Sequence, residues 1–78
     1  MVQRILSINH PLNLNDVRRV VNRIKDIEIG EELVIQINNQ DSYRAEGIFS
    51  VLNSEKYQWS AKGGHNGKDY YIFARRKY

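Results

Sequence analysis

The chain has 78 residues, of which 41% are hydrophobic and 27% charged, and this balance is typical of one folded domain rather than of a disordered chain. Because it contains no cysteine, disulfides, cysteine-ligated zinc, iron–sulfur clusters and thiol nucleophiles are excluded. The net charge is +3, no apolar run approaches the ~20 residues that a membrane span needs, and no signal peptide is apparent, so we expect a cytoplasmic protein without a membrane partner.

The first third of the chain predicts a strand followed by an amphipathic helix. Residues 3–8 are β-prone, and residues 9–11, Asn-His-Pro, interrupt the strand because proline cannot extend a hydrogen-bonded ladder. Over residues 14–27 apolar side chains recur at helical spacing, with charged and amide side chains on the opposite face. The expected buried positions of this helix are Leu14, Val17, Val20, Val21, Ile24 and Ile27.

Residues typical of helix starts and helix ends flank this periodic segment. Asn13 or Asn15 can cap its N-terminus, because an amide oxygen accepts hydrogen bonds from free backbone N–H groups. Asp16 suits the positive end of the helix dipole, and Gly30 is expected to form the turn that follows.

The middle of the chain predicts a buried strand and a second helix. Residues 33–37 contain four apolar side chains in five, which indicates a central strand. Residues 38–42 are expected to form a loop that ends in capping residues, and the segment from Tyr43 to Asn53 is expected to form a helix. Gly47 weakens this helix by about 1 kcal/mol relative to alanine. Its expected buried positions are Ala45, Ile48, Phe49 and Leu52.

The last third of the chain predicts a hairpin. Residues 57–61 and 69–75 are expected strands, and the glycine-rich residues 63–67 are the expected loop between them. Alternation along the first of these strands separates Tyr57, Trp59 and Ala61 from Gln58, Ser60 and Lys62. The second set is the more polar one, so we expect Trp59 to point toward the helices and to lie largely in the core.

These elements together define a fold class. Their order is β-α-β-α-β-β, and the two helical crossovers predict a two-layer α/β (α+β) sandwich over residues 1–78. We expect a mixed four-stranded sheet with two helices on one face, and a single domain.

The same frame resembles the TusA-like (SirA-like) family of small sulfur-carrier proteins. The family signature Leu-Asp-x-Arg-Gly-Leu-x-Cys-Pro-x-Pro, which leads into the first helix, aligns without a gap with residues 6–17. Gly30-Glu31, the strand residues 33–35, the acidic Asp41 and the closing hairpin continue the resemblance in order and spacing. It covers nearly the whole chain, with few identical residues.

The resemblance implies a loss of chemistry at one position. The family's sulfur-carrying cysteine falls on Asn13 and the proline after it on Leu14. An asparagine amide cannot carry sulfane sulfur, so Asn13 keeps only the capping role. We therefore expect no sulfur transfer, no other enzymatic activity and no cofactor.

Other candidate chemistry is sparse. His10 and His65 lie too far apart in sequence to form a metal pair, and a zinc site needs three or four ligands. Both are expected to be turn histidines, although His10 lies in the segment that aligns with the family's active loop and remains a candidate for binding an anion or a partner. The glycine-rich residues 63–68 lack P-loop spacing, and no nucleophile–base pair is evident.

Basic side chains near aromatic ones suggest binding instead of catalysis. The aromatic residues of the predicted hairpin alternate, so some of them face away from the helices, as in folds that bind single-stranded nucleic acid. The candidate binding residues are His10, Asn13, Arg18, Arg19, Arg23, Arg75 and Arg76. The leading hypothesis is a protein-interaction module that docks a protein partner through the first helix. The alternative is a basic domain that binds single-stranded RNA, and the oligomeric state stays open.

Overall fold

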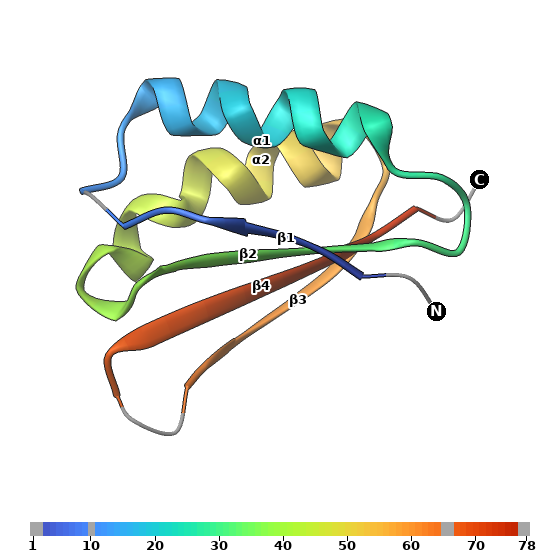
Figure 1. Ribbon diagram of the computed structural model, residues 1–78. Coiled ribbons are helices and arrows are strands. Elements are labelled where there is room, and N and C mark those ends of the chain that lie inside the picture. Colours follow the sequence, from blue (N-terminus) through green and yellow to red (C-terminus); the bar gives the residue numbers. More distant parts are fainter. Residues whose placement is uncertain (1–2, 10, 65–66, 77–78) are drawn as a thin grey trace.

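The computed structural model describes residues 3–9, 11–64 and 67–76, and its elements follow the predicted order (Figure 1). They are β1 (Gln3–Ser7), α1 (Leu14–Asp26), β2 (Glu32–Asn38), the 3-10 helix η1 (Asn39–Ala45), α2 (Glu46–Ser54), β3 (Gln58–Gly63) and β4 (Asp69–Arg75). No helix in these described ranges is long and apolar enough to cross a membrane.

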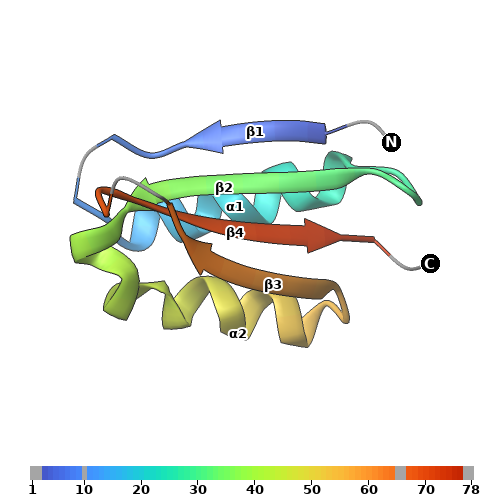
Figure 2. The same cartoon turned by 90° about the horizontal axis from the view of Figure 1, so that it is seen from below.

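The four strands form one mixed sheet in the order β1-β2-β4-β3. β1 is parallel to β2, whereas β4 is antiparallel to both of its neighbours, β2 and β3. The chain therefore crosses through α2 to the far edge of the sheet, and β4 returns into the gap between β2 and β3. Both α-helices cover the same face of this sheet, which confirms the predicted two-layer class and leaves the other face open (Figures 1 and 2).

The core lies between the helices and one face of the sheet. Alternate residues of each strand point into it, and the stripes of α1 and α2 close it from the other side. Its fully buried members include Leu6, Val20, Ile24, Ile27, Leu33, Ile35, Ile37, Ile48, Leu52, Ile72 and Ala74. Each fully buried aliphatic side chain stabilises the fold by about 1.5–3 kcal/mol relative to exposure, so this layer contributes most of the stability.

Trp59 faces the helices, as predicted from the alternation along β3. Its ring stacks on Phe49 of α2, with centroids 4.3 Å apart and planes 6° apart. Its indole Nε1 donates to Oδ1 of Asn53 at 2.9 Å. Because β3 is an edge strand, Trp59 is half-buried at the rim of the core instead of lying in its centre.

Helix α1 begins at a capping box. The Oδ1 atom of Asn13 accepts from the N–H groups of Asn15 at 2.9 Å and Asp16 at 3.3 Å, and Oδ2 of Asp16 accepts from the N–H of Asn13 at 3.0 Å. Of the two candidate caps, Asn13 is therefore the one used. Asp16 is 1% exposed, because its place on the helix lies on the same side as Val20.

Leu14 was predicted to be buried, and this is wrong. Its side chain is 82% exposed, because the first helical position lies at the rim of the apolar stripe, which begins instead at Val17. The leucine is thus a surface feature of the first turn of α1.

The second helical segment also differs from the prediction. The expected loop over residues 38–42 is absent, because Oδ1 of Asn38 accepts from the N–H of Gln40 at 2.9 Å and starts η1 immediately after β2. The α-helix then begins at Glu46 instead of Tyr43. Gly47 allows a close approach of the helices, because a Cβ atom there would lie 3.3 Å from Cγ2 of Val17.

Candidate functional site

Three of the predicted binding residues, Arg18, Arg19 and Arg23, lie exposed on α1. A guanidinium nitrogen of Arg19 lies 3.5 Å from Oδ1 of the buried Asp16, so Arg19 is tied to the capping box. Within the described residues, Arg18 and Arg23 form no ion pair. The helix therefore presents a basic surface that begins beside the exposed Leu14.

The two arginines near the end of the chain lie in different places. Arg75 ends β4 on the open face of the sheet, and its guanidinium lies 3.5 Å from Oε2 of Glu32 on β2. Arg76 turns to the helix side, where it donates to the carbonyl oxygen of Ile27 at 3.0 Å. Arg76 thus holds the end of α1 against the end of β4.

The five arginines consequently do not form one basic face. The two layers of the fold separate Arg75, on the sheet, from Arg18, Arg19 and Arg23 on α1. Asn13 lies at the start of α1 as a cap, and His10 lies outside the described residues.

A second candidate surface is the open face of the sheet, which the sequence predicted only in part. The half-buried Tyr71 and Phe73 lie on this face in the middle of the sheet, because Tyr70, Ile72 and Ala74 of the same strand point toward the helices. The alternation along residues 69–75 carried this information, but the sequence could not show that β4 is a central strand.

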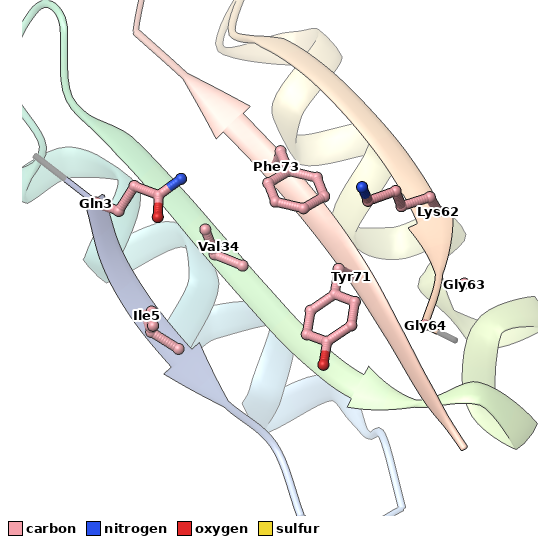
Figure 3. A pocket seen from close by; sticks show the side chains of 8 residues that line it. All are labelled: Gln3, Ile5, Val34, Lys62, Gly63, Gly64, Tyr71 and Phe73. Atoms are coloured by element: carbon pink, nitrogen blue, oxygen red, sulfur yellow. The ribbon is translucent and has the colours of Figure 1, made fainter. Parts of the chain in front are cut away.

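A hollow of about 540 Å³ lies on this open face (Figure 3). Phe73 and Tyr71 of β4, Val34 of β2 and Ile5 of β1 form its apolar floor, with the rings side by side along the strand. Ile5 is 64% exposed, which is unusual for an isoleucine in a strand. Gln3, Lys62, Gly63 and Gly64 complete the lining.

A second hollow of about 220 Å³ adjoins the first along β4. It is more polar, and it shares Phe73 with the first hollow. Its other lining residues are Glu32, Gln58, Trp59, Ser60 and Arg75. One aromatic ring is therefore accessible from two sides.

The charged groups around this face are partly paired. Glu32 accepts from Nε2 of Gln3 at 2.6 Å and lies close to Arg75. Arg4, at the edge of the sheet, lies 3.4 Å from Glu31. The pKa of Glu31 lies below its ordinary value because the N–H of Glu28 donates to this carboxylate, and Arg4 acts in the same direction.

The described residues contain no group of three or more His, Asp or Glu side chains that could hold a metal ion. Their fully buried carboxylate, Asp16, has one oxygen on the backbone cap and the other beside Arg19. This arrangement stabilises a helix start and leaves the surfaces of α1 and of the sheet as the candidate functional sites.

Comparison of the chain with protein-family models, with curated proteins and with solved structures finds no match. The two surfaces must therefore be interpreted from their own chemistry.

Proposed function

We propose that this chain is a non-catalytic protein-interaction module, a relative of the TusA-like family without the sulfur-carrying cysteine, which docks a protein partner through α1. The observation that carries the proposal is the 82% exposed Leu14 in the first turn of a basic helix. An isolated exposed leucine is ordinary, but here Arg18 follows one turn later on the same side of the helix. A partner segment with an apolar residue beside acidic ones fits this surface.

The capping box supports the proposal because it fixes the geometry of the contact surface. Asn13 and Asp16 hold the first turn by reciprocal hydrogen bonds, so Leu14 is presented on a rigid backbone. Binding through a preorganised element costs less conformational entropy than binding through a loop. The proposal retains the cytoplasmic location and the absence of catalysis that the sequence analysis expects.

Site-specific photo-crosslinking tests this surface. A photoreactive residue replaces Leu14 in one sample and Ile29 in the other, since Ile29 is an exposed apolar residue in the turn after α1. We expect a crosslinked protein from nuclease-treated cells with the first sample only. The same product from both positions would contradict docking through α1.

Affinity for the crosslinked protein, once purified, supplies the second half of the test. We expect Leu14→Ala and Arg18→Glu each to weaken binding at least tenfold, because both remove contacts at the centre of the surface. Arg44→Glu is the matched control, since Arg44 is an exposed arginine of η1. Equal losses for Arg18→Glu and Arg44→Glu would assign the effect to net charge and refute the proposed surface.

A further inference from the structure

The open face of the sheet carries an aromatic pair that neither α-helix covers. Tyr71 and Phe73 lie two residues apart on the central strand β4, with ring centroids 6.4 Å apart and planes tilted by 33°. Both helices pack on the opposite face (Figures 1 and 2). The two rings are half-buried and offer their accessible sides to a ligand.

The strand register arranges three rows of four residues across this face, and a fourth row, Asn38 and Asp69, spans β2 and β4 only. The middle row is mostly apolar, and the rows on each side of it carry amide, hydroxyl and charged groups. The middle row consists of Ile5, Val34, Phe73 and Ser60. The outer rows consist of Ser7, Gln36, Tyr71 and Lys62 on one side, and of Gln3, Glu32, Arg75 and Gln58 on the other.

Cations lie on both sides of Phe73. The ammonium of Lys62 lies 5.7 Å from the centre of the Phe73 ring, and Arg75 follows Phe73 on the same face of β4. Glu32, which lies 3.5 Å from the Arg75 guanidinium, also accepts from Gln3. A ligand that contacts Phe73 therefore lies near the Lys62 ammonium and near the Arg75–Glu32 pair.

This combination matches the chemistry of a nucleic-acid strand. Bases stack on accessible aromatic rings, their edges form hydrogen bonds with amides and hydroxyls, and their phosphates contact lysine and arginine. The apolar part of the face is narrow, because it consists of the middle row and the adjoining Tyr71 ring, and this suits flat bases better than the broad apolar centre of a protein interface. We infer that the open face of the sheet binds single-stranded nucleic acid, with Phe73 and Tyr71 as platforms for bases and with Lys62 and Arg75 as phosphate contacts.

This site is independent of the proposed docking of a protein through α1. It uses the open face of the sheet instead of the surface of α1. A failure of either idea leaves the other one intact.

Fluorescence anisotropy with a labelled single-stranded RNA of about ten nucleotides tests the aromatic pair. We expect binding at low salt, and we expect Phe73→Leu and Tyr71→Leu each to weaken it by roughly 5- to 150-fold, the equivalent of one lost stacking contact. Tyr43→Leu is the matched control, because Tyr43 is 69% exposed on η1, away from this face. We expect this control to leave affinity unchanged.

The salt dependence tests the two cations separately. Each phosphate contact contributes about −0.7 to the slope of log affinity against log salt for a single strand. Lys62→Gln and Arg75→Gln should each reduce the slope by about this amount, whereas Arg18→Gln on α1 should not. Both positions are exposed, so these variants keep the test valid if a ring variant fails to fold.

Two controls define the ligand and the integrity of the fold. A single-stranded DNA of the same sequence should also bind, because stacking and phosphate contacts do not need the 2′-hydroxyl; tighter binding of RNA would add a hydroxyl contact. Trp59 stacks on Phe49 of α2, so its emission reports whether each variant is folded.

Four outcomes would overturn the inference. The first is unchanged anisotropy at high protein concentration and low salt. The second is an equal effect of Tyr43→Leu and Phe73→Leu. The third is preferential binding of duplex RNA. The fourth is a wild-type dimer in sedimentation that Phe73→Leu converts to a monomer, because a second copy of the chain would then cover the face.

Discussion

Replacing Asn13 by alanine isolates the contribution of the capping box. The variant removes the oxygen that accepts from the N–H groups of Asn15 and Asp16, and both groups then lack their cap. Loss of such a cap costs about 1–2 kcal/mol. For a domain of this size each kcal/mol lowers the melting temperature by roughly 4–8 °C. Urea titration followed by far-UV circular dichroism should show a lower midpoint with an unchanged slope.

Matched variants at the same helix end make this test specific. Asn13→Ser restores an accepting oxygen and should recover most of the lost stability. Asn15→Ala changes an exposed asparagine inside the first turn, where alanine is the better helix former, so stability should stay equal or rise slightly. If Asn13→Ala and Asn15→Ala had the same effect, the capping argument would be refuted.

Further predictions concern a buried phenol, a close helix contact and sulfur chemistry. Burial raises the pKa of the Tyr57 phenol above its ordinary value of 10.0. The contribution of this group to the free energy of unfolding is therefore complete below pH 10, and it is lost as the pH rises through the pKa of the folded state. Tyr57→Phe should remove this loss of stability at alkaline pH. At neutral pH the variant should lower the free energy of unfolding by about 0.5–1.5 kcal/mol, because the Tyr57 hydroxyl donates to the carbonyl of Ile24 at 3.0 Å. Urea unfolding at several pH values measures both effects. Gly47→Ala should leave stability within about 1 kcal/mol of wild type, because the half-buried Val17 can shift while the helix gains propensity; a larger loss in urea unfolding would show that Val17 is fixed. A persulfide donor should leave the intact mass of the wild-type chain unchanged, and Asn13→Cys alone should give a slowly alkylated thiol, which timed alkylation and mass spectrometry can check.

The period of the apolar pattern was enough to predict where α1 runs, but not which of its residues are buried. The spacing of apolar residues identifies the apolar face of the helix, but the way the helix packs on the sheet decides which part of that face is most deeply buried. Val20 and Ile24 are in this part, whereas Leu14 falls outside it and the charged Asp16 falls inside. Asp16 is tolerated there because its oxygens receive the N–H of Asn13 and the guanidinium of Arg19.

The candidate binding surface was less predictable for a topological reason. Alternation along residues 69–75 separates Tyr71 and Phe73 from their neighbours, but a strand's place in the sheet depends on long-range pairing. The insertion of β4 between β2 and β3 brings Phe73 opposite Val34 and Ser60 and gives the rings a central position. The same pairing places Arg75 on the sheet face, which separates it from the arginines of α1.

The start of α1 shows why introducing a cysteine at position 13 should not by itself create a reactive thiol. The positive end of a helix stabilises a thiolate when its N–H groups and dipole are free to act on the sulfur. In this chain Asp16, 1% exposed, lies at that helix end and accepts from the N–H of Asn13, so a thiolate would meet a carboxylate fixed three residues away. Like charges at such a distance disfavour the ionised thiol. Asn13→Cys combined with Asp16→Asn should therefore alkylate faster than Asn13→Cys alone, provided that circular dichroism shows both variants folded. Equal alkylation rates would mean that Asp16 does not influence this helix end electrostatically.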